Sequence, residues 1–148
     1  MILSELFTKP AKWTPKTEQI NLAIYTFKTS DERLFYVNFE KSNDGWQFDF
    51  NDETYSFKMT GQGNAVEIFA TVKDIALHFF KKYKPDTLVY FQAGLDEPSR
   101  IKLYDRAAKM IGPALPGYKT MTGIEGNHKT YLIAPEDSDE WDWRQDAN

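Results

Sequence analysis

The spacing of apolar residues changes along this chain of 148 residues, and that change limits the possible folds more than any other feature. In the first third of the chain, large side chains alternate with polar ones, as in residues 46–50 (WQFDF). Period two with aromatic residues predicts β-strands. Further along, apolar residues recur at the three- and four-residue intervals of an amphipathic helix. The chain therefore changes from strand-forming to helix-forming sequence.

Four strand-like segments open this order, at residues 20–28, 33–40, 46–50 and 55–59. A polar turn separates the first two, and Asn43-Asp44-Gly45 precedes the third. The Asp-Gly pair favours the positive φ of a tight hairpin. Consecutive strands joined by short turns predict an antiparallel meander.

Two helices are predicted, over residues 63–83 and from Asp96 or Glu97 to residue 111. The first ends before Pro85, and the second has Pro98 in its first turn. Residues 86–92, between the helices, are strand formers with little alternation, which predicts a central strand covered on both faces.

Two final strands are predicted at residues 118–122 and 128–134. The predicted order is β-β-β-β-α-β-α-β-β, an α+β fold with a mixed, mainly antiparallel sheet and two helices. We expect a single domain over residues 19–135.

The two ends of the chain differ from this domain. Residues 1–18 contain Pro10 and Pro15, which disfavour a helix or a central strand, so we expect an extended arm. Residues 136–148 contain six acids and one Arg, the composition of a solvated acidic tail. Large apolar side chains at the two ends could dock on the domain or on a partner: Leu6, Phe7 and Trp13 in the arm, and Trp141 and Trp143 in the tail.

Charge and composition exclude several classes of function. The net charge of −4 argues against general nucleic-acid binding. The tail carries −5, so residues 1–135 carry +1, and the argument is weaker for this part, although the sequence shows no basic face there. The chain has no cysteine and two distant histidines, so no metal site is expected. No apolar run is long enough to span a membrane, and the first residues do not resemble a signal peptide. We expect a soluble protein of the cytoplasm.

The segment from Lys58 to Ala65 (KMTGQGNA) lies between a predicted strand and a predicted helix. Its two glycines allow a tight turn and close approach of the backbone to a ligand. The N-terminus of the following helix presents unpaired N–H groups, a combination that suits a phosphate or pyrophosphate. The alternative is that Gly61 and Gly63 only form the turn.

The element order and this loop resemble the GNAT superfamily of acyl-CoA N-acyltransferases, over residues 20–134. In that family a Gln/Arg-x-x-Gly-x-Gly/Ala loop holds the pyrophosphate of acetyl-CoA, and Lys58-x-x-Gly61-x-Gly63 is similar, with Lys in place of Gln/Arg. The resemblance implies an acetyl-CoA site at Lys58, Gly61, Gln62, Gly63, Asn64 and Ala65.

A second match to the family lies in the second predicted helix. Leu103-Tyr104-Asp105-Arg106 resembles the family's Leu-Tyr-Glu-Lys, which implies that Tyr104 is the acid that protonates the CoA sulfur. The alternative is a core tyrosine at helical spacing. No base is defined: Asp49, Asp52 and Glu53 lie near the relevant strands, but we expect each of them to be solvated, and Asp52 and Glu53 could form a turn with Asn51.

The chain also resembles small uncharacterised proteins of tailed bacteriophages, in a Ser-Arg-x-Lys-Leu-Tyr-Asp-Arg helix (residues 99–106) and a Lys-Pro-Asp strand entry. This resemblance implies a viral source and a place in the host cytoplasm or the virion. Two functions follow. One is an acetyl-CoA-dependent N-acetyltransferase with an unknown amine acceptor. The other is a non-catalytic phage accessory or virion protein that uses the fold to bind a host or virion protein.

Overall fold

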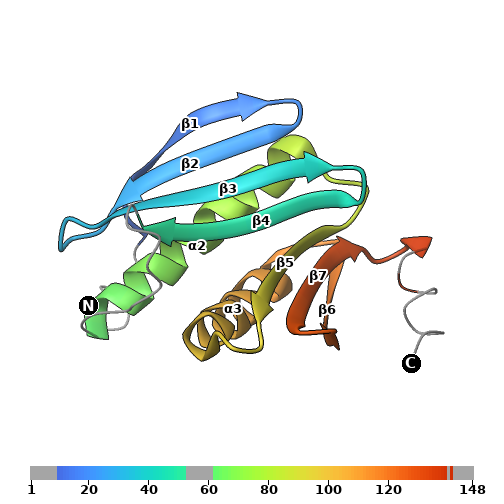
Figure 1. Cartoon of the computed structure of the whole chain (residues 1–148). Helices are drawn as coiled ribbons and strands as arrows, with labels where there is room; N and C mark the ends of the chain where they lie inside the picture. The colour runs from blue at the N-terminus through green and yellow to red at the C-terminus, as the bar shows by residue number, and fades with distance from the viewer. Residues whose placement is uncertain (1–9, 53–61, 140, 142–148) are drawn as a thin grey trace.

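The structure, a computed structural model, describes residues 10–52, 62–139 and 141, with only the backbone for residues 62–65 (Figure 1). Its strands form one sheet in the order β1-β2-β3-β4-β5-β7-β6. Its elements, in chain order, are β1 (Trp13–Gln19), β2 (Leu22–Lys28), β3 (Leu34–Ser42), β4 (Gly45–Asp52), α2 (Gln62–Tyr83), β5 (Val89–Gly94), α3 (Pro98–Ile111), the 3-10 turn η1 (Gly112–Ala114), β6 (Tyr118–Glu125) and β7 (His128–Pro135).

The predicted fold class and the order of elements are confirmed, but the first strand lies earlier than predicted. Strand β1 occupies Trp13–Gln19, within the segment expected to be an extended arm, and pairs antiparallel with β2. The predicted strand at residues 55–59 lies outside the described residues. The first of the four strands is therefore β1, and the predicted strand at residues 20–28 is the second, β2.

Strand β1 forms despite Pro15 because it lies at the edge of the sheet, where a missing N–H is tolerated. Its register with β2 shifts between Pro15 and Thr17, so a bulge accommodates the proline. Contacts with α2 hold the strand from the other side. The Ala11 N–H donates to Thr71 Oγ1 (2.8 Å), and Trp13 Nε1 donates to Asp74 Oδ2 (2.8 Å). The expected docking of Trp13 on the domain is thus confirmed.

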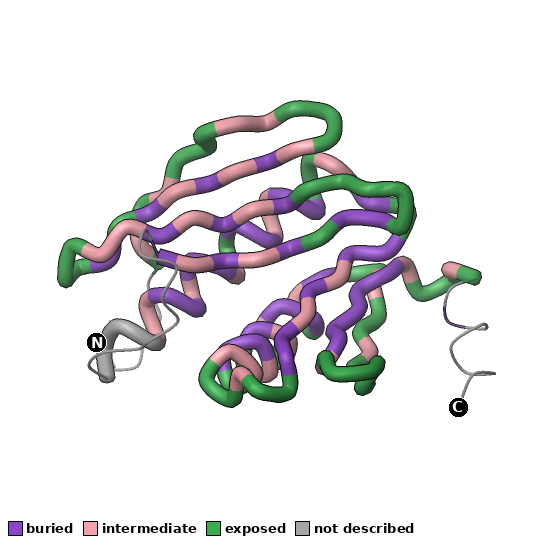
Figure 2. Tube along the Cα trace, viewed as in Figure 1, coloured by how far each residue is buried: buried purple, intermediate pink, exposed green. Residues whose placement is uncertain are grey.

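Both helices pack on one face of the sheet, and the aromatic residues fill the space between (Figures 1 and 2). Strands β2, β3 and β4 alternate buried and more exposed positions, as the period-two pattern predicted. Rings from the two layers meet directly: Phe39 stacks on Phe79 of α2, with centroids 3.8 Å apart. The core is therefore mainly aromatic on the side of α2.

Among the described residues, the face of the sheet opposite the helices is covered only over β5, β7 and β6. There Trp141, 3% exposed, packs with Leu88, Leu132 and Ala134. The Trp141 Nε1–H donates to the Pro135 carbonyl (2.7 Å). Trp141, within the acidic tail, is therefore fixed on the domain, whereas Trp143 lies outside the described residues. Strand β5 is fully buried only on the helix side, because Tyr90 and Gln92 remain partly exposed on this other face.

Candidate functional site

Strands β4 and β5 are the one parallel pair among the described strands, and their pairing is short. Only Trp46–Val89 and Gln47–Tyr90 are in register, although both strands continue for several residues. Figure 1 shows that the strands then diverge, and that α2 and α3 begin on the side where they separate. We call the region at the carboxyl ends of β4 and β5, where the two strands no longer pair, the open end. In open sheets ligands bind at such points, where parallel strands part.

The closed end of the strand pair depends on Gly45. Its φ is +133°, which confirms the positive φ predicted for the Asp-Gly turn. A Cβ at this position would lie 2.2 Å from the Leu88 carbonyl oxygen, which accepts a hydrogen bond from the Trp46 N–H (2.8 Å). Only glycine lets the backbones approach this closely. A close backbone contact thus holds β4 and β5 together at one end.

The first turn of α2 contains four of the residues that the sequence analysis assigned to a CoA site: Gln62, Gly63, Asn64 and Ala65. Their backbones are helical, and the helix carries no acidic residue in its first turn. Its N–H groups therefore form an end of positive potential at the open end, without a carboxylate from the same turn to neutralise it. The other two candidates, Lys58 and Gly61, lie outside the described residues.

The predicted acid, Tyr104, lies on α3 and is 1% exposed. Its ring packs edge-on against Phe91 of β5 (5.1 Å between centroids) and lies 5.8 Å from Phe50 of β4. Tyr104 therefore bridges the two diverging strands from the helix side. The alternative of a core tyrosine at helical spacing is therefore confirmed.

The charges around Tyr104 identify its neighbours. Burial raises the pKa of the Tyr104 hydroxyl well above its ordinary value, and the negative charges of Asp49 and Glu97 add to the rise, whereas Arg100 lowers it. The hydroxyl also makes a hydrogen bond with the backbone of Phe50, which lowers the pKa. This bond places the hydroxyl against the backbone of β4. The phenol therefore remains protonated across the ordinary pH range.

Of the candidate bases among the described residues, Asp49 is the one whose negative charge raises the pKa of Tyr104. It alternates with the buried Phe48 and Phe50, so its side chain lies on the face of β4 opposite the helices. It is partly exposed and accepts a hydrogen bond from Asn38 Nδ2 (2.9 Å) on β3. Asp52 is instead buried and paired with Arg33 (2.9 Å), so the expectation that it is solvated is wrong. Glu53 lies outside the described residues. Arg100 and Glu97, 3.5 Å apart at the start of α3, complete the charged groups near the hydroxyl.

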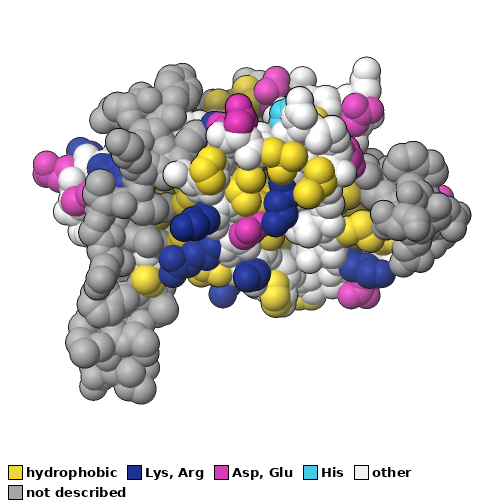
Figure 3. Space-filling model, turned by 60° about the horizontal axis from the view of Figure 1, so that its bottom comes forward, with side chains coloured by type: hydrophobic (Ala, Val, Ile, Leu, Met, Phe, Trp, Pro, Cys, Tyr) yellow, Lys and Arg dark blue, Asp and Glu magenta, His cyan; other side chains and the backbone are white. Residues whose placement is uncertain are grey.

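The exposed side of α3 is basic. Lys102, Arg106 and Lys109 recur at four- and three-residue intervals and are all exposed. Figure 3, which brings the lower side of Figure 1 forward, shows Lys and Arg side chains gathered among hydrophobic ones, with few carboxylates between them. A surface of this kind suits an anionic ligand. The nearly neutral charge of residues 1–135 gave no sign of it, because acids elsewhere compensate these cations.

Sequence reasoning missed a polar cluster between β1 and α2. Glu18 accepts hydrogen bonds from Tyr25 Oη (2.7 Å) and Lys82 Nζ (2.8 Å), and it lies 2.9 Å from His78 Nε2. Burial alone would raise the pKa of Glu18, but the hydrogen bonds of Lys82, Tyr25 and His78 outweigh it and lower the pKa to about 2. The cluster fixes β1 on the helix. Glu18 lies 60 positions from His78 and 64 positions from Lys82 in the sequence, so local patterns could not show these contacts.

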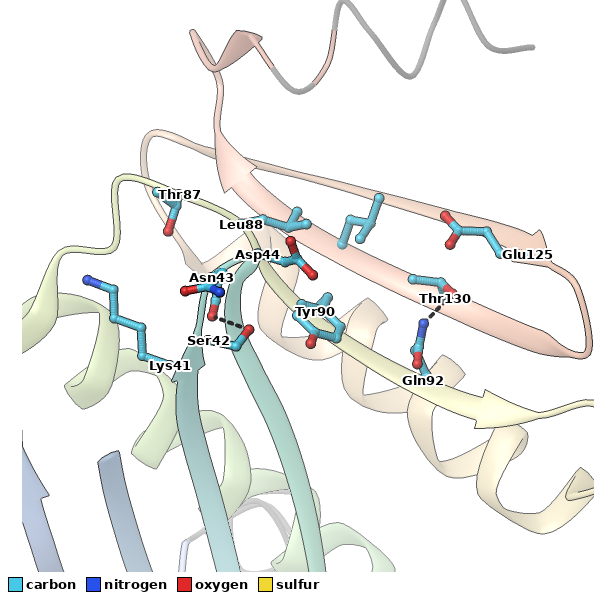
Figure 4. A pocket seen from close by; sticks show the side chains of 12 residues that line it. Lys41, Ser42, Asn43, Asp44, Thr87, Leu88, Tyr90, Gln92, Glu125 and Thr130 are labelled. Atoms are coloured by element: carbon cyan, nitrogen blue, oxygen red, sulfur yellow. Dashed lines mark hydrogen bonds between the residues drawn. The ribbon is translucent and has the colours of Figure 1, made fainter. Parts of the chain in front are cut away.

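A hollow lies on the face of the sheet opposite the helices (Figure 4). It has a volume of about 520 Å³ and is lined by the β3–β4 hairpin, Leu88, Tyr90 and Gln92 of the β5 region, and Glu125 and Thr130 of the final hairpin. Gln92 Nε2 donates to Thr130 Oγ1 (3.3 Å) across its floor. Its lining mixes one lysine with two carboxylates and no cluster of like groups, so it indicates no ligand class.

Comparison of the chain with protein-family models, with curated proteins and with solved structures found no match. In the part of the chain that the structure describes, no group of His, Asp and Glu side chains could hold a metal ion. Among the same residues, no helix has the length and apolarity needed to cross a membrane.

Proposed function

We propose that the protein binds acetyl-CoA at the open end and transfers the acetyl group to an amine, as the resemblance to GNAT proteins implies. The observation that carries the proposal is the parting of β4 and β5 after two paired residues, beside the first turn of α2. Unpaired N–H groups of that turn suit a pyrophosphate, and the cations of α3 suit the remaining phosphate.

In this proposal Tyr104 acts as a hydrogen-bond donor to the thioester sulfur. Because its pKa is raised above about 10, the phenol is a weaker acid than a thiol with a pKa of about 8.5. Complete proton transfer to the leaving thiolate would therefore be uphill, whereas a hydrogen bond in the transition state still stabilises the developing charge. Holding thioester and amine together supplies the rest of the rate. Asp49 is the carboxylate that could accept the proton of the amine.

The experiment is a calorimetric titration with acetyl-CoA, followed by an assay of free CoA thiol with small amines and peptides as acceptors. We expect Tyr104→Phe to leave the dissociation constant within about threefold and to slow transfer by about a hundredfold. The matched control is Tyr118→Phe. The Tyr118 side chain is half-buried, and its hydroxyl donates to the Pro85 carbonyl (2.8 Å), beyond the other end of α2. No heat of binding at millimolar acetyl-CoA would reject the proposal.

One observation favours the second function, a non-catalytic protein that binds a host or virion protein. Tyr104 is almost fully covered, so an acetyl group reaches its hydroxyl only if the surrounding side chains move. A binding protein requires no such access.

A chain that ends after Trp141 tests the role of the tail in this second function, because it keeps the tryptophan that packs on the domain. Under this function, the shortened chain should lose a partner that the full chain captures from host or virion lysate. An identical partner list, with acetyl-CoA binding intact, would leave the enzyme as the better account.

A further inference from the structure

The two edges of the sheet differ in their protection against pairing with another strand. Strand β1, at one edge, has Pro15, Lys16 and a bulge, which are the devices that block such pairing. Strand β6, at the other edge, has a regular register with β7 over its whole length and no proline. Its central residues, 120–124 (TMTGI), carry no charge.

Strand β6 is also open to solvent. Its exposed residues include Thr120, Thr122, Gly123 and Glu125. Ile124 is 68% exposed and is one of the three exposed large hydrophobic side chains among the described residues. A Cβ added to Gly123 would meet no atom within 4 Å. A long, uncharged edge with β-branched residues can pair with another strand.

The outward hydrogen-bonding groups of β6 follow from its turn. Residues 126–127 form a two-residue turn between Glu125 and His128, so this closing pair exchanges hydrogen bonds within the hairpin. Because such pairs alternate along an antiparallel ladder, Thr120, Thr122 and Ile124 direct their N–H and C=O groups away from β7. No described strand pairs with these groups, so a further strand can bind them.

We propose that β6 pairs antiparallel with β6 of a second copy of this chain, about a two-fold axis at Thr122. The two charges that flank the uncharged segment select this partner and this register. Centred on Thr122, the pairing places Lys119 opposite Glu125 of the other copy, and the symmetry repeats the contact. Both residues lie on the same face of the sheet, since they are an even number of positions apart. Ile124 then lies opposite Thr120, a favourable β-branched pair.

The complementarity is specific to this register. Moving the axis by one residue, to Met121 or Gly123, places Lys119 and Glu125 opposite uncharged residues. The pairing would join two sheets into one continuous sheet. It uses neither the open end nor Tyr104, so it is independent of the proposed function.

The test is sedimentation velocity of the full chain at loading concentrations from about 10 to about 500 µM, because an interface based on one strand pair is small and weak. We expect a concentration-dependent dimer. Thr122→Pro removes an outward N–H and should leave a folded monomer, with an unchanged circular dichroism spectrum. A monomer at all concentrations for the unmodified chain would overturn the proposal.

Charge reversal provides a second, independent test. Lys119→Glu and Glu125→Lys each create two like-charge contacts and should weaken the dimer about tenfold or more, whereas the double variant should restore it. Lys119 also lies over the Trp141 ring (5.7 Å), so restoration by the double variant is the deciding result. Lys102→Glu, an exposed lysine on α3, is the matched control and should have no effect. A dimer insensitive to Thr122→Pro and to both single reversals, or one not restored by the double variant, would reject this pairing.

Discussion

The two halves of the sheet are held together by different means. Strands β1–β4 pack on α2 through stacked aromatic rings, and the Glu18 cluster fixes their outer edge. Strands β5, β7 and β6 pack on α3 on one face and under Trp141 on the other. The halves meet through two residue pairs of β4 and β5, a close backbone contact at Gly45 and the rings around Tyr104. Phe48 also packs on Phe91, and Phe80 on Tyr118. The two halves thus share one hydrophobic core, while the strand pairing between them is confined to one end of β4 and β5.

The largest effect is expected from a steric clash at the close backbone contact between Gly45 and Leu88. Gly45→Ala introduces a Cβ 2.2 Å from the Leu88 carbonyl oxygen at a φ that disfavours any side chain. We expect a loss of about 4 kcal/mol in the free energy of unfolding, measured by urea denaturation. Gly123→Ala is the control, because its Cβ meets nothing and its φ is not positive, and it should change stability by less than about 0.5 kcal/mol. Similar losses for both variants would contradict the role of Gly45.

The next effect concerns only the second half. Trp141→Ala removes the buried ring that covers Leu88 and Leu132, and it should lower the free energy of unfolding by about 3 kcal/mol. Trp141→Phe keeps most of the apolar contact but loses the hydrogen bond to the Pro135 carbonyl, so about 1 kcal/mol is expected. Hydrogen exchange should rise in β6 and β7 and stay unchanged in β2 and β3. Equal changes in both halves would contradict a role of Trp141 that is confined to the second half.

A smaller, pH-dependent effect is expected in the first half. Glu18→Gln should destabilise the protein by about 1–2 kcal/mol at pH 7, because the ionised carboxylate accepts the Lys82, Tyr25 and His78 contacts. Since its pKa is lowered from 4.5 to about 2, this contribution is complete above pH 4.5 and is lost as the pH falls towards 2.

The difference in stability between Glu18→Gln and the unmodified chain should therefore shrink over that interval. A difference that stays constant from pH 6 to about 2.5 would contradict the assignment. Glu40→Gln, an exposed carboxylate on β3, is the control.

Local sequence patterns predicted most of the fold. The changes of period placed α2 and α3 to within about two residues, because burial of one helix face imposes that period. The pattern missed β1, since Pro15 argues against a strand unless the bulge and the contacts with Thr71 and Asp74 are known. Those contacts join residues about sixty positions apart, and no local rule predicts them.

The site was predictable only in part. Tyr104 was proposed from the resemblance, and the start of α2 from its glycines and N–H groups as well. The effect of the Asp49 charge on the pKa of Tyr104 depends on how α3 packs on the sheet, which no local pattern predicts. Trp141 was expected to be either a partner anchor or a domain contact, and its burial on Leu88 and Leu132 decides for the second.

The most direct test of the open end as a ligand site is hydrogen exchange with and without saturating acetyl-CoA. We expect slower exchange at the carboxyl end of β4, in the first turn of α2 and at the end of β5, with no change in β1, β2 or β6. No protection anywhere, or protection confined to the β3–β4 hairpin and the hollow beside Tyr90, would contradict the account.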